Sequence, residues 1–401
     1  MKILVTGAAG FIGFHLIRNL IKNKKNDIVG VDSINGYYPT KIKNLRLKLL
    51  SRNKKFFFKK INLQNKNRLD SIFSKYKPDV VFHLAGQPGV LYSFKNPKSY
   101  TLNNINATKV LSAISKKHHV KKFILGSSSS VYGDQKKFPI KESYIKNPKN
   151  YYAKTKLMSE KIIKKSFINT ETEFMIFRFF TVYGSFGRPD MFIHKYLNAI
   201  KNNKKINLHN NGSNYRDFTY VEDLVKILTR SLDEFPKEKI LNICRSKPIK
   251  TTKLISMINK LYKNKKNLLI KTGIVKGEML KTHGSNKLLK MNFKPIKFKN
   301  IKLAYIIPIS IMLISDLFIG FSYISIFVYL AFILITTYSF IVKSYHVKNI
   351  LFSSLIFFIV TNFGVWLLGG YTYSLEGLIL CYTMAIPFFT NSILADLFFS
   401  G

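Results

Sequence analysis

Three glycines follow the first apolar run of the chain and set the strongest limit on its fold. In "KILVTGAAGFIG", Gly7, Gly10 and Gly13 come directly after a predicted strand and at the start of a predicted helix. Glycines at this point permit a tight turn and let a pyrophosphate approach the N–H groups of a helix N-terminus. The motif therefore predicts the first βαβ unit of a dinucleotide-binding fold. The alternative is a glycine turn that only packs the helix onto the strand.

An acidic residue at the end of the second predicted strand supports the dinucleotide site. The strand "DIVGVD" ends in Asp32, 19 residues beyond Gly13. A carboxylate at this place can accept hydrogen bonds from an adenosine ribose. Because an acid repels a 2′-phosphate, we expect NAD rather than NADP.

Short apolar runs alternate with helix-length, lysine-rich segments through the first half of the chain. The later runs are "KPDVVFHLAG", "KKFILGSS" and "FMIFRFF". Strands of this length separated by helices are typical of a parallel sheet. We expect an α/β fold with a Rossmann-type, doubly wound parallel sheet over residues 1–180. The irregular pattern after Phe186 predicts a smaller α/β domain over residues 181–298, which binds mainly substrate.

The charge of the chain is strongly positive, with a net charge of +45. Such an excess is compatible with nucleic acid, an acidic membrane surface or an anionic substrate as the partner. The lysines are scattered, without the aromatic-interleaved basic stripe that follows a nucleic-acid backbone. Lys, Asn, Ile and Phe are also abundant throughout, as in chains encoded by AT-rich genomes. We therefore expect no nucleic-acid partner.

The cysteines and the N-terminus limit the cellular setting. Cys244 and Cys381 are the only cysteines and lie far apart, so no disulfide framework or cysteine-based zinc site is readable. No metal site is predicted. The first strand begins at the N-terminus and leaves no room for a cleaved signal peptide, which places the catalytic part in the cytoplasm.

The character of the chain changes at about Ile301. Apolar segments follow at about 303–321, 323–342, 350–369 and 377–398. Each is close to the ~20 residues that cross a bilayer. We expect an all-α transmembrane region of about four helices over residues 301–401, in the inner (cytoplasmic) membrane. A soluble helical bundle is the alternative.

Charges in this tail predict its orientation. Lys343 and Lys348 separate the second and third apolar segments, while the other two loops have no Lys or Arg. This asymmetry, with the basic stretch before Ile301, places both termini in the cytoplasm. Asp316 and Asp396 fall within or at the end of apolar segments. An acid there is either a functional-site candidate or a capping or interfacial residue.

Two further motifs carry candidate catalytic groups. "GSSSSVYG", from Gly126 to Gly133, ends an apolar run and is either a flexible spacer or the wall of an active site. "NYYAKTK" places Tyr152 and Lys156 four residues apart, on one face of a helix. A neighbouring ammonium lowers the pKa of a phenol and makes the phenolate available as a base.

With these motifs, residues 1–295 resemble the extended short-chain dehydrogenases/reductases of the nucleotide-sugar epimerase and dehydratase group. The resemblance implies that Ser128 hydrogen-bonds the sugar 4-hydroxyl, that Tyr152 is the base and that Lys156 also holds the nicotinamide ribose. It places His83 under the cofactor as a structural residue and implies a homodimer. The residues that it assigns to NAD are Gly7, Gly10, Phe11, Ile12, Gly13, Asp32, Asn62, Leu63, Leu84, Ala85, Asn104, Tyr152 and Lys156.

The two positions after Ser128 separate the reactions of this group. The dehydratases carry Asp-Glu there, because eliminating water needs a general acid and a general base. This chain has Ser129 and Ser130. The glutamate that nucleotide-sugar decarboxylases keep beside the tyrosine motif is absent too. The pattern therefore favours 4-epimerisation, in which hydride leaves C4, the 4-keto sugar rotates and hydride returns to the opposite face.

Longer blocks resemble the UDP-glucuronate 4-epimerases. They include "DSINGYYPTKIKNLRLKLL", "HLAGQPGVLYS", "RFFTVYGSFGRPDMF" and "RDFTYVEDLV". This resemblance assigns Ser129 and Ser130 to the sugar carboxylate and Arg216 to the diphosphate. It also places Thr181, Arg188 and Glu278 in the substrate pocket. Surface ion pairs are the alternative for Arg188 and Arg216.

Two positions depart from that subgroup. Leu91 stands where the subgroup has an arginine, which removes a polar substrate contact. Asn62 replaces an aspartate near the adenine and can still accept a hydrogen bond. The first departure keeps a UDP-glucose or UDP-N-acetylhexosamine 4-epimerase open as an alternative.

The tail resembles an uncharacterised bacterial integral-membrane family. A genuine fusion implies an epimerase anchored by membrane lipid beside membrane glycosyltransferases, in surface polysaccharide biosynthesis. Two neighbouring reading frames joined by a deletion or an assembly error are the alternative. A membrane transporter or sensor with an inactive nucleotide-sugar-binding module is a further alternative.

Overall fold

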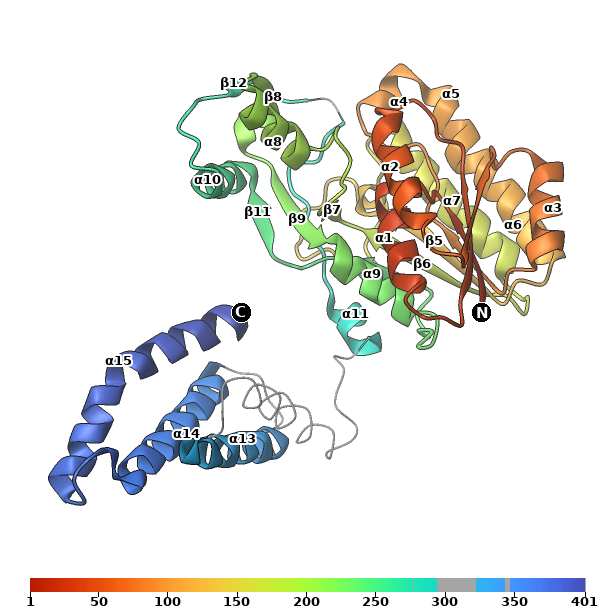
Figure 1. The fold of residues 1–401 in the computed structure, drawn as a ribbon. Helices are drawn as coiled ribbons and strands as arrows, with labels where there is room; N and C mark the ends of the chain where they lie inside the picture. The colour runs from red at the N-terminus through yellow and green to blue at the C-terminus, as the bar shows by residue number, and fades with distance from the viewer. Residues whose placement is uncertain (276, 294–321, 343–346, 401) are drawn as a thin grey trace. The chain divides into compact units, whose positions relative to one another are not determined.

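The computed structural model describes residues 1–275, 277–293, 322–342 and 347–400 (Figure 1). The chain divides into two compact units, Met1–Pro295 and Ile296–Gly401. Each unit is described by itself.

A parallel sheet forms the centre of the first unit. Its seven strands run in the order β10-β6-β5-β4-β1-β2-β3. Every neighbouring pair is parallel. The strands are β1 (Lys2–Thr6), β2 (Asp27–Asp32), β3 (Phe56–Lys60), β4 (Val80–His83), β5 (Lys122–Ser128), β6 (Glu173–Phe179) and β10 (Ile240–Ile243). This order confirms the predicted Rossmann-type sheet. From β1 the chain adds β2 and β3 on one side and then β4, β5 and β6 on the other. Sheets of this kind bind ligands at the point between β1 and β4 where the strand order switches sides.

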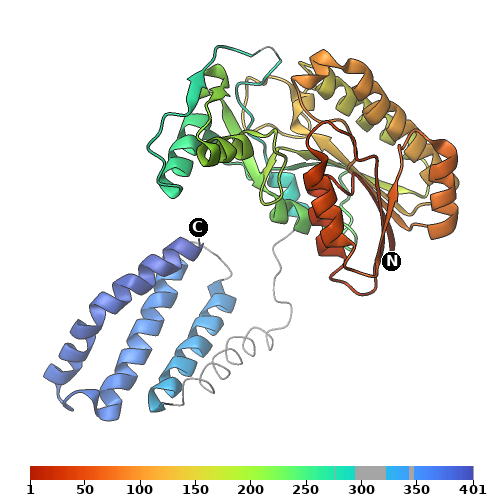
Figure 2. The same ribbon diagram turned by 45° about the horizontal axis from the view of Figure 1, so that its top comes forward.

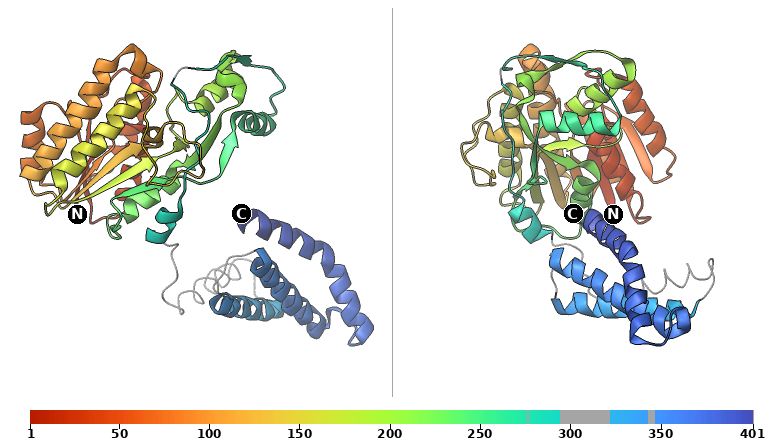
Figure 3. Two further views of the ribbon diagram at one scale, coloured as in Figure 1. Left: turned by 180° about the vertical axis from the view of Figure 1, so that it is seen from behind. Right: turned by 90° about the vertical axis from the view of Figure 1, so that its left-hand side faces the viewer.

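Helices cover both faces of this sheet, as Figures 1 and 3 show. One face packs against α1 (Phe11–Leu20), α2 (Thr40–Leu50) and α9 (Val221–Arg230). The other packs against α3 (Lys66–Tyr76), α6 (Ala107–Lys117) and α7 (Tyr151–Phe167). Successive strand residues point to opposite faces, so Ile3 enters one core and Leu4 the other. Burial on both faces explains the uninterrupted apolar runs in the sequence.

Short connecting helices complete the first unit. They are α4 (Tyr92–Lys95), α5 (Pro97–Tyr100) and α11 (Lys287–Asn292), with a π-helical turn at Thr101–Asn106 and 3-10 turns at Ser129–Tyr132 and His209–Gly212.

A smaller α/β region follows the large sheet in the sequence. Strand β9 (Tyr215–Tyr220) pairs with β7 (Thr181–Tyr183) in parallel and with β11 (Pro248–Lys250) in antiparallel orientation. A second pair joins β8 (Ile206–Leu208) to β12 (Leu269–Lys271). Helices α8 (Phe192–Asn202) and α10 (Thr251–Leu261) pack over a separate small core. The division at residue 180 remains a prediction, and the structure adds that α9 and β10 return to the large sheet.

The described part of the tail unit is helical. It contains α13 (Tyr323–Val342), α14 (Val347–Val365) and α15 (Leu375–Ser400), and α14 continues as a π-helical turn over Trp366–Gly370. Figure 2 shows these helices side by side. They match the last three predicted apolar segments, while the segment 303–321 lies outside the described residues.

Within the described residues, one helical stretch, Leu351–Gly370, is long and apolar enough to cross a membrane. The apolar stretches Tyr323–Ser339 and Leu375–Thr390 are shorter. The prediction of about four membrane-spanning helices is therefore not confirmed. Pro387 lies within α15, and Gly369, with φ of 82°, lies inside the turn after α14.

Candidate functional site

A cleft of about 670 Å³ lies at the carboxyl ends of the large sheet and extends to the smaller region. Its lining includes every residue predicted for the site except Asn104: Gly7, Gly10, Phe11, Ile12, Gly13, Asp32, Asn62, Leu63, Leu84, Ala85, Ser128, Ser129, Ser130, Tyr152, Lys156, Thr181, Arg188, Arg216 and Glu278. Residues far apart in the sequence thus meet at one site. Their individual ligand contacts stay predictions.

The glycine loop is shaped for close approach of a ligand to the backbone. Gly7 has φ of +72° and donates its N–H to Val31 O at 2.8 Å. A Cβ on Gly13 would lie 2.2 Å from Gly7 O, and one on Gly7 would lie 2.8 Å from Ala85 N. Helix α1 begins after Gly10 without a side-chain cap. Its first N–H groups therefore remain available to a phosphate, as NAD requires.

Asp32 lies at the end of β2, at the edge of this loop. Its carboxylate accepts hydrogen bonds from Ile34 N at 2.7 Å and Ala9 N at 3.1 Å. Burial raises the pKa of Asp32, and these backbone bonds and the charge of Lys43 oppose the rise. The backbone bonds fix the carboxylate beside the cleft, where it fits an adenosine ribose.

Ser128, Tyr152 and Lys156 meet where β5 ends and α7 begins. Asn150 caps α7, because its Oδ1 accepts from Ala153 N at 2.9 Å. Tyr152 lies close enough to Ser128 for that side chain to act on the pKa of its phenol. Lys156 donates from Nζ to Gly126 O at 2.9 Å. Burial lowers the pKa of Lys156 to about 8, against the opposing charge of Glu160.

The predicted effect of Lys156 on the phenol differs from what the structure shows. Burial raises the pKa of Tyr152, and the Ser128 side chain and the charge of Arg188 oppose that rise. The ammonium of Lys156 is turned to the Gly126 carbonyl instead. Arg188 is therefore the cation that favours the phenolate in this arrangement.

The serine run forms a wall of the cleft. Ser129 and Ser130 are buried in the 3-10 turn that follows β5. Ser130 and Ser128 are linked through their Oγ atoms at 2.9 Å. Within the described residues, the acids that line the cleft are Asp32, Asp190 and Glu278. None of these occupies either of the two positions directly after Ser128, so the pair of acids that dehydration requires is missing there.

Arg188 is anchored by two residues that the sequence did not indicate. Its Nε and Nη2 donate to the carboxylate of Asp190 at 3.0 and 2.5 Å. Tyr37 donates its hydroxyl to the same carboxylate at 3.1 Å. The spacing in "GRPD" could have indicated the arginine–aspartate pair, but no local pattern connects Tyr37 to it.

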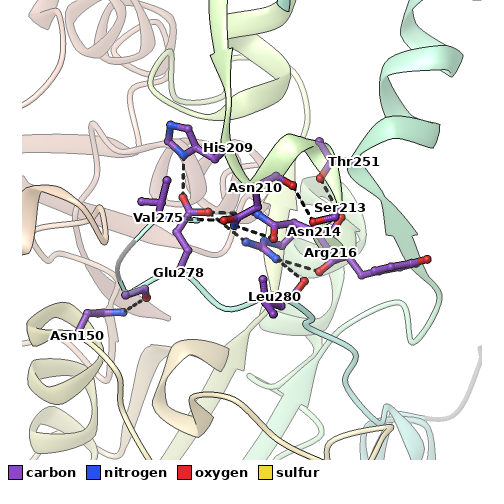
Figure 4. A network of polar contacts seen from close by, with 12 residues as sticks. Asn150, His209, Asn210, Ser213, Asn214, Arg216, Thr251, Val275, Glu278 and Leu280 are labelled. Carbon is purple, nitrogen blue, oxygen red and sulfur yellow. Dashed lines mark hydrogen bonds and ion pairs between the residues drawn. The ribbon is translucent and has the colours of Figure 1, made fainter. Parts of the chain in front are cut away.

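A polar network surrounds Arg216 and Glu278 in the smaller region (Figure 4). Glu278 accepts from His209 Nδ1 at 3.1 Å and from Asn214 Nδ2 at 3.3 Å. Arg216 Nη2 lies 3.8 Å from the same carboxylate. The predicted diphosphate arginine thus has an anionic neighbour, and sequence reasoning missed His209 and Asn214.

Asn104 lies behind the cleft wall instead of lining it. Its Oδ1 accepts from Gln87 N at 2.7 Å, and its Nδ2 donates to Thr155 Oγ1 at 2.9 Å. The side chain therefore joins the loop after β4 to α7.

His83 is buried as a structural residue. Its ring nitrogens contact Thr6 Oγ1 and Thr108 Oγ1, each at 2.9 Å. Burial lowers its pKa to about 3, so the ring is neutral. In the part of the chain that the structure describes, no group of three metal-ligating side chains is found.

Comparison with known families places this site in a class. Residues 3–244 match the NAD dependent epimerase/dehydratase family, and residues 293–401 match a family of unknown function (DUF6580). The chain belongs to the NAD dependent epimerase/dehydratase family. The predicted family and the predicted cofactor, NAD, are confirmed.

Individual proteins and one crystal structure are similar to this chain. Protein CapI of Staphylococcus aureus is 38% identical over 285 residues, which cover 66% of this chain and 84% of that protein. A UDP-glucuronate 4-epimerase of Thermodesulfobacterium geofontis is 35% identical over 263 residues, covering 65% of this chain and 81% of that protein. The crystal structure of UDP-glucuronic acid 4-epimerase from Bacillus cereus with UDP-glucuronic acid and NAD superposes with a TM-score of 0.68 at 32% identity, covering 74% of this chain and 95% of that one.

Proposed function

We propose that this chain is an NAD-dependent 4-epimerase that interconverts UDP-glucuronate and UDP-galacturonate. NAD, when bound, supplies the acceptor and donor of the hydride at C4 of the sugar. The residues of the chain bind the sugar, move the 4-hydroxyl proton and hold the ring between the two hydride transfers.

The pair formed by Ser128 and Tyr152, which line the same cleft at the end of β5 and the start of α7, is the observation that carries this proposal. It lies in the cleft beside Lys156, and Ser129 and Ser130 take the place of a general acid and base. Tyr152 can accept the 4-hydroxyl proton while Ser128 holds the same oxygen. This set supports oxidation and reduction at C4 but not elimination of water.

The sugar carboxylate has suitable partners in the same cleft. The hydroxyls of Ser129, Ser130 and Thr181 line it together with the guanidinium of Arg188. Hydroxyl donors and one fixed cation suit an acidic sugar. The similarity to UDP-glucuronate 4-epimerases supports the same substrate.

Leu91 favours an alternative substrate. This apolar side chain lines the cleft and is 40% exposed. A cleft with fewer cations favours a neutral sugar, so a UDP-glucose or UDP-N-acetylhexosamine 4-epimerase is the second candidate. The assembled Ser128, Tyr152 and Lys156 argue against a transporter or sensor with an inactive module.

The test is product identification by NMR after the protein is incubated with a panel of UDP-hexoses. We expect UDP-galacturonate from UDP-glucuronate. Tyr152→Phe should lower kcat by about 10²- to 10⁴-fold, as loss of a general base does. Tyr151→Phe is the matched control, because Tyr151 bonds Thr101 Oγ1 at 2.7 Å and is absent from the described cleft lining. A dehydrated or decarboxylated product would overturn the assignment.

The tail is the basis for a proposal about the cellular role of the enzyme. One candidate membrane helix and the match to a separate family support attachment to the inner membrane, with the catalytic unit and both termini in the cytoplasm. In that setting the enzyme supplies UDP-galacturonate to membrane glycosyltransferases that build surface polysaccharide. We also propose a homodimer.

A further inference from the structure

Arg188 and Asp190 form a partly buried ion pair with a fixed geometry. The two side chains are 22% and 26% exposed. Two N–H groups of the guanidinium bond the two oxygens of the carboxylate, and Tyr37 bonds one of these oxygens from a segment 153 residues away. Bidentate pairs of this kind fix orientation in a way that exposed single-contact pairs do not.

The backbone just before Arg188 is held by a residue of α2, the helix that follows the Tyr37 segment. Arg46, on α2, is fully buried and donates from Nη2 to Phe186 O at 2.6 Å and to Gly187 O at 3.2 Å. Tyr37 belongs to the segment between β2 and α2, so one part of the chain holds both the backbone before Arg188 and its side-chain partner.

This arrangement leaves part of Arg188 free for a ligand. A guanidinium has five N–H donors. Within the described residues, Asp190 accepts two hydrogen bonds from Arg188, and the Tyr37 ring centroid lies 5.9 Å from the guanidinium carbon. The remaining donors belong to a side chain that lines the cleft.

Arg188 also acts on the candidate base. Its charge opposes the rise that burial causes in the pKa of Tyr152. Two further titratable groups near Tyr152 are Lys156, one helical turn along α7, and Tyr100, whose ring centroid lies 6.2 Å away. Lys156 is turned to the Gly126 carbonyl. The placement of Arg188 therefore bears on both the substrate and the base.

We propose that Asp190, assisted by Tyr37, is a positioning residue of the epimerase, which holds Arg188 so that its free donors face the sugar and its charge faces Tyr152. The inference rests on the proposed function and assigns a role to two side chains outside the Ser128, Tyr152 and Lys156 set. Asp190 acts only through Arg188, so its substitution has no consequence once the guanidinium is gone.

A double-mutant cycle tests this dependence, with kcat/KM for UDP-glucuronate as the readout. Asp190→Asn keeps the shape of the side chain and removes its charge, and we expect a loss of about tenfold, as for loss of a charge-assisted pair. Tyr37→Phe removes one hydrogen bond and should cost about threefold. In the Arg188→Gln background, neither substitution should lower kcat/KM further.

Asp70→Asn is the matched control, because it weakens contacts with Lys117 and His118 away from the cleft and should leave kcat/KM unchanged. Asp190→Asn with wild-type kcat/KM would overturn the inference. So would a loss of the same size in both backgrounds, since it would show a purely structural role. If the wild-type protein epimerises no UDP-sugar, the proposed function itself fails and the inference falls with it.

Discussion

Lys156 has an ammonium group whose charge depends on pH within the working range of an enzyme. Its pKa is lowered to about 8 from 10.5, chiefly by burial. Lys156, which we propose holds the nicotinamide ribose, loses its positive charge as the pH rises through about 8. The protonation of this single side chain should therefore affect how activity changes at alkaline pH.

We predict that kcat/KM falls as the pH rises above about 8. Lys156→Arg keeps a charge at high pH, so its remaining activity should not show that fall. Initial rates across neutral and alkaline pH measure this.

The titration of Lys156 does not itself destabilise the fold over this pH range. Between the folded pKa of about 8 and the unfolded value of 10.5, the unfolded chain binds more protons at Lys156. This group therefore adds stability as the pH rises through that window. An activity loss that follows a fall in the melting temperature would contradict the assignment.

Leu91 gives a second prediction at this scale. Leu91→Arg adds a cation to the cleft, and a charge-assisted contact with the sugar carboxylate is worth about 1.5–3 kcal/mol. We expect the ratio of kcat/KM for UDP-glucuronate over UDP-glucose to rise by about tenfold. Leu91→Met is the control without charge. An unchanged ratio in Leu91→Arg would show that the sugar carboxylate lies elsewhere.

Local residue patterns indicated the proposed catalytic residues but not the partners that surround the cleft. The spacing of Tyr152 and Lys156 on one helix and the glycines before α1 are visible within a few residues. The contact of Tyr37 with Asp190 spans 153 positions, and that of His209 with Glu278 spans 69. Contacts of this range depend on the packing of separate segments, and no periodicity in the sequence encodes them.

At the scale of elements, α7 carries Tyr152 and Lys156, the proposed catalytic tyrosine and lysine, and a buried ion pair fixes this helix to the sheet. Glu160 accepts from Arg178 of β6 at 2.9 and 2.6 Å and from Ser127 of β5 at 2.6 Å. Both side chains of the pair are almost fully buried. The network sets the distance between α7 and the strand that ends in Ser128.

Glu160→Gln should therefore lower both stability and activity. Removing one partner of a buried pair leaves an uncompensated charge and costs about 3–5 kcal/mol. Chemical denaturation and kcat measure the two effects. Asp223→Asn is the control, because its pair with Lys226 is exposed and should contribute less than about 1 kcal/mol. A stable, fully active Glu160→Gln would contradict this role.

The order of the elements was predictable only in part. Alternating strands and helices indicated the parallel sheet, because each apolar run is continuous when both faces are buried. The return of β10 to the edge of the large sheet was not predicted. "ILNI" is a short apolar run inside a region of polar loops, and its partner β6 lies far back in the sequence.

At the scale of the whole molecule, the chain combines a family enzyme with a helical tail. The two units separate at about residue 295, and the family matches cover 3–244 and 293–401. Hydropathy predicted the tail helices after 322 because lipid-length apolar runs are continuous in the sequence. It could not fix how many of them span a bilayer.

We predict that the native protein is recovered at full length in the membrane fraction. Alkaline carbonate should not release it, whereas detergent should, because apolar helices are held by the hydrocarbon and not by charge. Epimerase activity should follow the full-length band on fractionation. Recovery of a shorter, soluble epimerase would contradict attachment through the tail.

The central claim is reversible transfer of the C4 hydrogen of UDP-glucuronate, and the reaction in D2O tests it most directly. Hydride that leaves and returns within the cleft does not exchange with water, so NMR should show UDP-galacturonate with hydrogen at both C4 and C5. Deuterium at C4 or C5 of the product, or a product that has lost water or its carboxyl group, would contradict the account.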